Sequence, residues 1–161
     1  MLHTFLSRLW KLFAGSLQWR LLWIFHSKFI IGVSAVIIDP NGNVLLLRHA
    51  YWKARSWGLP SGYVVKGESL QSAMKREIQE ETGLDVEIVR LLQVRSGFRL
   101  RLELTFVGRN AAGMPQVRSG EILEARFFSI SDLPNGLLSS HRELILRAFD
   151  ASANASEVHL V

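Results

Sequence analysis

The chain has 161 residues, of which 48% are hydrophobic and 20% charged, as is typical of one globular domain rather than a disordered chain. It has no cysteine, which excludes disulfides, thiolate zinc sites and a cysteine nucleophile and fits a cytoplasmic location. The formal net charge is +5, but the positive excess lies in residues 1–60, which contain seven Lys or Arg and one acidic residue. Residues 61–161 contain twelve Lys or Arg and thirteen acidic residues. We therefore expect no bulk nucleic-acid binding.

Residues 1–28 are predicted to form an amphipathic, aromatic and basic helical segment that Gly15 interrupts. Basic residues break every window long enough for a membrane span, and no secretory signal is evident. Two interpretations stay open. The segment packs on the domain or on a second copy in a homodimer, or its tryptophans and basic residues make peripheral contact with an anionic membrane.

Residues 29–150 are predicted to form the main domain, and residues 151–161 a flexible tail. A helix is predicted from Ser69 to Thr82, ended by Gly83 at the usual C-cap position. Strands alternate with turns on both sides of it, and a short helix follows, which predicts a mixed α/β sandwich. The other predicted elements are strands 30–39 and 44–50 as a hairpin, strands 86–96 and 98–109 joined near Gly97, strand 122–130 and helix 139–149.

Three glutamates of the central helix, Glu77, Glu80 and Glu81, lie on one face because they are spaced i, i+3 and i+4. Such clustering costs about 0.2–0.5 kcal/mol per like-charged pair and has no structural benefit. A solvated acidic face is the ordinary interpretation of these three residues alone. The residues around them favour a functional interpretation instead.

The acidic run is part of a longer pattern, which a chance sequence would match about once in a billion starts. In order, its fixed positions are Gly62, Glu68, Arg76, Glu77, Glu80, Glu81 and Gly83, with aliphatic residues at Ile78 and Leu84. This pattern resembles the full signature of the Nudix hydrolases (the MutT-like family), over residues 31 to 149. The resemblance implies a Nudix-type α/β/α sandwich with a mixed sheet. It also implies divalent-metal-dependent hydrolysis of a phosphoanhydride bond in a nucleoside diphosphate linked to another moiety.

The resemblance further implies Mg²⁺, or alternatively Mn²⁺, held by Glu77, Glu80, Glu81 and Glu68. Such ions neutralise phosphate charge and lower the pKa of an attacking water. Arg76 would orient one of the carboxylates.

The resemblance also bears on positions outside the acidic helix. Many members carry glycine where this chain has Ser61, and we expect Gly62 to turn the backbone sharply before the helix. Family members often supply a further glutamate late in the chain, for which Glu121 and Glu124 are the candidates, with a surface salt bridge as the alternative for each. The general base stays open among Glu80, Glu81 and Glu121.

Substrate contacts are predicted from arginines. Arg95, Arg99 and Arg101 share parity on the predicted strand pair and would grip phosphates; a solvated face paired with Glu103 is the alternative. Arg48 begins an aromatic stretch that offers phosphate and stacking contacts or buttresses the sheet.

The segment after the acidic helix lacks the markers of ADP-ribose and dinucleoside polyphosphate hydrolases. Nucleoside triphosphates, nucleotide sugars and CDP-alcohols therefore stay open as substrates. Two alternative functions are a non-catalytic nucleotide-binding module and a membrane-docked hydrolase of lipid-linked diphosphates.

Overall fold

The computed structural model describes residues 15–96, 100–110, 113–150 and 159–160. The predicted helix over the first fourteen residues and most of the predicted tail lie outside these residues. Within them, no helix has the length and apolar character needed to span a bilayer. His159–Leu160 form a short strand, β8, which pairs in parallel with a strand of the main sheet.

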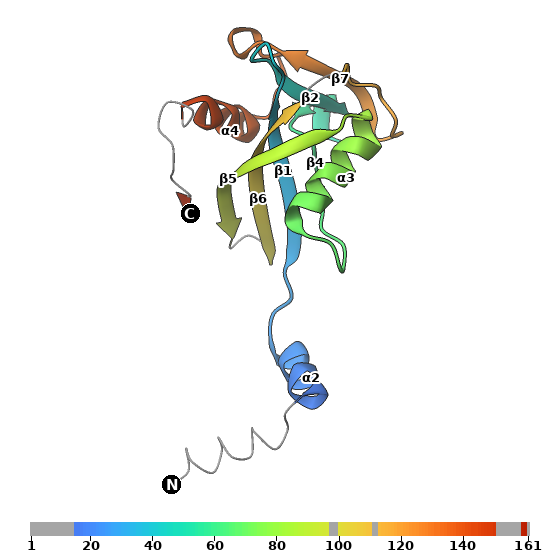
Figure 1. Ribbon diagram of the computed structural model, residues 1–161, viewed down its shortest axis with the longest axis vertical. Coiled ribbons are helices and arrows are strands. Elements are labelled where there is room, and N and C mark those ends of the chain that lie inside the picture. The colour runs from blue at the N-terminus through green and yellow to red at the C-terminus, as the bar shows by residue number, and fades with distance from the viewer. Residues whose placement is uncertain (1–14, 97–99, 111–112, 151–158, 161) are drawn as a thin grey trace.

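The N-terminal helix α2, Ser16–Phe25, stands clear of the domain (Figure 1). Its Trp19 and Phe25 side chains are 74% and 79% exposed. In this structure α2 therefore does not pack on its own domain, which was one of the two interpretations of this segment. The chain then runs through an extended stretch directly into β1, Ile30–Ile38.

Strand β1 lies in the centre of a mixed sheet. It pairs in parallel with β6, Arg101–Asn110, over its whole length, from Ile30 opposite Arg101 to Ile38 opposite Arg109. Its pairing with β2, Val44–His49, is limited to Ile38 opposite Val44. The predicted hairpin is therefore correct only at its turn, because the two strands diverge and take other partners.

The remaining strands extend the sheet on both sides. Strand β5, Val86–Ser96, pairs antiparallel with β6. Strand β4, Ser61–Tyr63, pairs antiparallel with the first half of β1. Strand β2 pairs antiparallel with β3, Trp57–Gly58, and with β7, Ile122–Phe128. The sheet mixes parallel and antiparallel pairs, as predicted.

Two helices cover opposite faces of this sheet, α3 at Leu70–Thr82 and α4 at Ser139–Asp150. Ser69 caps the start of α3 by accepting a hydrogen bond from the Ser72 amide, and Gly83 ends it with φ 71°, the left-handed conformation that favours glycine. Short 3₁₀ turns occur at Lys53–Arg55 and Ile130–Asp132. The α/β/α sandwich is therefore confirmed.

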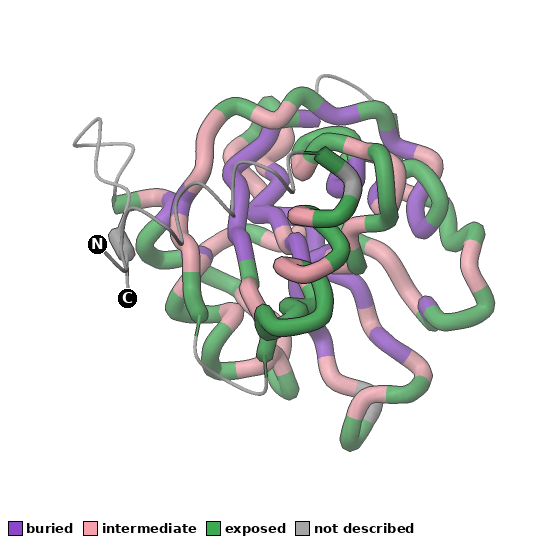
Figure 2. Tube along the Cα trace, turned by 90° about the horizontal axis from the view of Figure 1, so that it is seen from below, coloured by how far each residue is buried: buried purple, intermediate pink, exposed green. Residues whose placement is uncertain are grey.

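The two layers have separate apolar cores, and buried segments gather at the centre of the molecule (Figure 2). Met74 and Ile78 of α3 pack with Ile37 on one face of β1, whereas Ile145 of α4 packs with Val36 on the other. Side chains alternate along a strand, so Ser34, two residues before Val36, lies on the same face as Val36, the α4 face. Here the apolar core gives way to polar side chains, and a cavity begins.

Candidate active site

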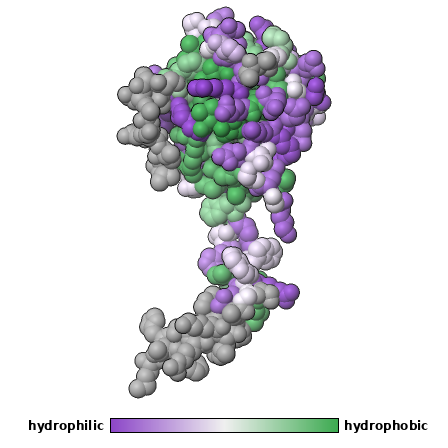
Figure 3. Space-filling model, viewed as in Figure 1, coloured by the Kyte–Doolittle hydropathy of each residue, from purple (hydrophilic) through white to green (hydrophobic). Residues whose placement is uncertain are grey.

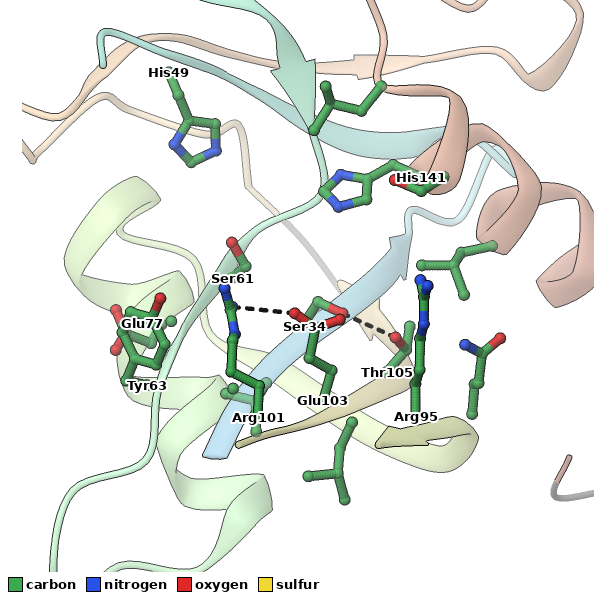
Figure 4. Close-up of a pocket in the computed structure, with 18 of the residues that line it drawn as sticks. Ser34, His49, Ser61, Tyr63, Glu77, Arg95, Arg101, Glu103, Thr105 and His141 are labelled. Carbon is green, nitrogen blue, oxygen red and sulfur yellow. Dashed lines mark hydrogen bonds and ion pairs between the residues drawn. The ribbon is translucent and has the colours of Figure 1, made fainter. Parts of the chain in front are cut away.

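A cavity of about 830 Å³ is lined by polar residues of the sheet and by side chains from both α3 and α4; its size is typical of small-molecule sites. Strands β1, β5 and β6 form its floor, where Ser34 Oγ and Thr105 Oγ1 lie 2.9 Å apart (Figure 4). The charged side chains that line it are Arg76, Glu77 and Glu81 from α3, Arg95 and Arg101 with Glu103 from the floor, Glu121, and Glu143 with Arg147 from α4.

Gly62 lies in β4 with Glu77 packed against it. A Cβ atom on Gly62 would lie 2.0 Å from Glu77 Cδ. The expectation of a sharp turn at Gly62 is wrong, because the residue is part of a strand. The expectation that a side chain does not fit there is supported, since the carboxylate of α3 occupies the space on its way to the cavity.

Arg76 holds three of the predicted metal ligands. Its Nε and Nη2 donate to the two carboxylate oxygens of Glu68 at 3.1 and 3.0 Å. Its Nη1 donates to Glu77 at 2.9 Å and to Glu80 at 3.4 Å. These hydrogen bonds raise the pKa of the Arg76 guanidinium further above its usual range, and hydrogen bonding to Glu68 has the largest effect.

Glu68 does not line the cavity. One of its oxygens also accepts a hydrogen bond from the Val65 amide at 2.7 Å. The hydrogen bonds from Arg76 and then Val65 lower the pKa of this carboxyl. Arg76 and the Val65 amide thus orient Glu68, and its role as a metal ligand stays a prediction.

Glu81 is buried, with only 7% of its surface exposed, and lines the cavity. Burial, followed by the negative charges of Glu77, Glu121 and Glu80, raises the pKa of this carboxyl to about 8. Its Oε2 atom has no hydrogen-bond partner among the described residues. A buried, unpaired carboxylate oxygen beside other acids is the environment that a bound cation would stabilise.

The structure separates the two late glutamates. Glu121 lines the cavity, and its backbone oxygen accepts a hydrogen bond from the Ala50 amide at 2.8 Å. Glu124 lies outside the cavity and pairs with Arg48 at 3.2 Å and with Arg126 at 3.4 Å. The salt-bridge alternative therefore describes Glu124, and Glu121 is the one brought to the site.

Two of the four predicted substrate arginines reach the cavity. Arg95 and Arg101 point into it from the side opposite His49 and His141 (Figure 4). Arg101 pairs with Glu103 at 3.1 Å. Arg99 lies outside the described residues.

Arg48 does not line the cavity. Its guanidinium pairs with Glu124 and lies over the Trp57 ring, 5.8 Å from its centroid. Arg147 of α4, which the sequence analysis did not single out, does line it and donates a hydrogen bond to Gln93 at 3.2 Å. Its position on the helix gave no signal, because only the packing of α4 on the sheet brings it there.

An aromatic and imidazole cluster lines the wall next to β2. The rings of His49 and Trp52 stack with centroids 3.7 Å apart, and His141 meets the edge of Trp52 at 5.8 Å. His141 Nδ1 accepts a hydrogen bond from the Leu59 amide at 2.9 Å. Burial lowers the pKa of both histidines to about 4, and the charge of a protonated His141 lowers the pKa of His49 further. Both rings are therefore neutral at physiological pH.

The described residues hold no preformed cluster of three acidic or histidine side chains around one point. Arg76 instead lies between Glu68, Glu77 and Glu80. The side chains present nevertheless suit a hard divalent cation, because such ions prefer carboxylate oxygens. One of these oxygens, Oε2 of Glu81, has no hydrogen-bond partner among the described residues.

The structure thus combines a mixed α/β/α sandwich with one cavity that carboxylates of α3 and arginines of β5 and β6 line. The model of the NUDIX domain matches residues 28–148. The chain therefore belongs to the Nudix family.

Similar proteins include the NAD-capped RNA hydrolase NudC of Vibrio atlanticus, 27% identical over 111 residues, which are 68% of this chain and 41% of that protein. The 8-oxo-dGDP phosphatase NUDT18 of Homo sapiens is 32% identical over 109 residues, 65% of this chain and 34% of that protein. The chain thus spans about two fifths and one third of the length of these relatives.

Solved structures share the fold. A Nudix hydrolase from Nitrosomonas europaea superposes with a TM-score of 0.73 at 24% sequence identity, covering 84% of this chain and 78% of that one. Because the identity is low, this likeness shows the architecture and not the substrate.

Proposed function

We propose that this protein hydrolyses a phosphoanhydride bond in a nucleoside diphosphate linked to another moiety, with the help of Mg²⁺ or Mn²⁺. The observation that carries the proposal is the buried carboxylate of Glu81, which lines a ligand-sized cavity beside Glu77 and Glu121 and has an oxygen without a partner. The names of the two similar enzymes, an NAD-capped RNA hydrolase and an 8-oxo-dGDP phosphatase, support a nucleotide diphosphate as the common substrate element.

Glu77 and Glu81 are the residues best placed to hold a divalent ion, because both line the cavity. Glu80 is on the same helix face but is 60% exposed in its side chain and contacts Arg76. To hold the ion as well, Glu80 would exchange that contact, while Arg76 would keep its two hydrogen bonds to Glu68. Such an ion supplies charge neutralisation at the phosphates and acidifies a bound water.

Glu121 is our candidate for the proton acceptor. It lines the cavity, and its backbone is fixed by the hydrogen bond from the Ala50 amide. Glu77 and Glu81 would be committed to the ion, which makes them weaker bases. A base in the turn before β7 would accept the proton of the attacking water without giving up a metal contact.

Arg95 and Arg101 would bind the phosphates or another anionic group of the substrate. Both guanidiniums reach the cavity from its floor, and the Arg95 side chain forms no hydrogen bond or ion pair with the described residues. The guanidinium group suits bidentate contacts with phosphate oxygens. The cavity therefore has an acidic side for the ion and a basic side for the remainder of the substrate.

The test is a panel of nucleoside triphosphates, nucleotide sugars, CDP-alcohols, NAD and ADP-ribose with Mg²⁺ or Mn²⁺, with products identified by mass. We expect turnover that chelation by EDTA abolishes and that Glu80→Gln lowers about 10²–10⁴-fold. Glu87→Gln, an exposed change on β5 outside the cavity, is the matched control. Tight nucleotide binding without any metal-dependent turnover would instead identify a binding module.

A further inference from the structure

Helix α2 carries large apolar side chains that nothing in the described structure covers. Trp19, Trp23, Ile24 and Phe25 are between 60% and 79% exposed. The helix projects from the domain (Figure 1), and the lower end of the domain shows green, hydrophobic atoms on the face in view (Figure 3). Single exposed apolar residues are ordinary, but a contiguous group of this kind marks an interaction surface.

A second group of exposed apolar side chains lies at the end of the domain where β1 begins. Backbone pairing brings these residues together, since the Ile30 amide donates a hydrogen bond to the Leu100 carbonyl at 2.9 Å and Gly32 of β1 lies opposite Tyr63 of β4. Each member is between 50% and 57% exposed. We call α2 together with this end of the domain the α2–rim surface; the rim residues are Phe29, Ile30, Tyr63, Val65 and Leu100.

The charge on α2 and on the residues that flank it has one sign. The sequence holds no acidic residue before Asp39, whereas Arg20 and Lys28 lie on or next to α2. The Lys28 ammonium lies 4.5 Å from the centre of the Trp23 ring. A second copy of α2 packed against the first would bring cations against cations, with no acid on either helix to pair them.

Tryptophan beside lysine and arginine suits the boundary between lipid headgroups and acyl chains, because the amphipathic rings sit at that depth and the cations meet anionic headgroups. With ten residues, α2 is too short to cross a bilayer, which takes about 20. A short helix of this composition can instead lie in the plane of the interface.

We propose that the α2–rim surface binds to the surface of an anionic lipid bilayer. The apolar side chains of α2 enter the interface, and Arg20 and Lys28 contact the headgroups. Tyr63 and Val65 line the cavity as well as the rim, so the docked protein holds one edge of its cavity beside the lipid surface. This inference does not depend on the hydrolytic chemistry.

The experiment is co-sedimentation of the full chain with vesicles of phosphatidylcholine alone or with phosphatidylglycerol added, at low and high salt. We expect binding that requires phosphatidylglycerol and weakens with salt. Replacing both tryptophans of α2 (Trp19→Ser with Trp23→Ser) lowers binding by about tenfold or more. Met114→Ser, which removes a side chain that is 78% exposed elsewhere, leaves binding unchanged.

Unchanged thermal unfolding of the double variant shows that any loss of binding is not a loss of folding. The proposal fails if vesicles do not retain the wild type, or if both variants bind as the wild type does. It also fails if light scattering shows a stable dimer that the tryptophan changes dissociate, because the surface then belongs to a second copy. Since vesicle binding is measured without substrate, its failure and a failure of the proposed hydrolysis are separate results.

Discussion

The carboxylate of Glu77 fills the space that a side chain on Gly62 would need. A Cβ atom there would lie 2.0 Å from Glu77 Cδ and 2.2 Å from Glu77 Oε1, distances that real contacts do not allow. Gly62 on β4 thus gives the helix carboxylate access to the cavity around the edge of the sheet.

Gly62→Ala is therefore expected to displace Glu77. We predict a loss of about 100-fold in kcat/KM with a modest destabilisation of about 1–3 kcal/mol from overpacking. Steady-state kinetics and urea unfolding measure the two effects. Gly120→Ala is the control, because a Cβ there meets nothing within 4 Å; equal activity of the two variants would refute the steric argument.

Glu81 predicts a pH dependence of stability without metal. Its folded-state pKa is raised to about 8 from 4.5 by burial and by neighbouring acids. Between these values the folded state binds more protons than the unfolded one, so this residue's contribution makes stability fall as pH rises from about 5 to 8.

Glu81→Gln removes the titration and keeps the shape of the side chain. In EDTA at pH 8 we expect the variant to be about 2–4 kcal/mol more stable than wild type, with the gain vanishing near pH 5 and with turnover lost. Chemical denaturation at both pH values provides the test. A variant less stable than wild type at pH 8 would show that Glu81 is not strained in the metal-free protein.

Arg76→Lys keeps the charge but removes the planar group that contacts Glu68, Glu77 and Glu80 together. A lysine ammonium cannot form the two parallel hydrogen bonds to Glu68. We predict a 10–100-fold weaker metal affinity, measured by calorimetric titration with Mn²⁺. Arg126→Lys, an exposed change outside the cavity, controls for the conversion itself, and unaltered Mn²⁺ affinity in Arg76→Lys would argue against a positioning role.

The arginines give a matched comparison on the substrate side. Arg95→Gln and Arg101→Gln are expected to raise KM about 10-fold or more, because each loses a charge-assisted contact with an anionic group. Arg48→Gln is expected to leave KM unchanged, since Arg48 pairs with Glu124 outside the cavity. The reverse order of effects would place the substrate against β7 instead of the β5–β6 floor.

The two late glutamates separate the proton acceptor from a surface ion pair. Glu121→Gln is predicted to lower kcat about 10²–10⁴-fold and to remove one limb of the pH–rate profile. Glu124→Gln breaks ion pairs with Arg48 and Arg126 and should change stability by no more than about 1 kcal/mol. An unaltered pH profile in Glu121→Gln would return the base to the glutamates of α3.

Local patterns were sufficient to predict the helices and most strands. Ser69, Gly83 and the 3.6-residue spacing between them define α3, and the acidic face follows from that spacing. The parallel pairing of β1 with β6 was not predictable in this way, because it joins segments about 70 residues apart and periodicity says nothing about partners.

The position of Arg48 shows why site residues are harder to predict than elements. A register shift between Arg48 and His49 interrupts the pairing of β2 with β7. Such bulges re-aim side chains, and here His49 lines the cavity while Arg48 does not. A strict alternation counted along the sequence cannot anticipate a bulge.

The hydrogen bond from the Leu59 amide to His141 Nδ1 fixes the tautomer of that imidazole. With a pKa of about 4 the ring is neutral at physiological pH, and a nitrogen that accepts a hydrogen bond carries no proton, so the single ring proton lies on Nε2. The free nitrogen of His141 is then a donor to substrate oxygens and not an acceptor. This side chain cannot take a proton from water through Nε2, and that part of the reaction is left to the carboxylates across the cavity.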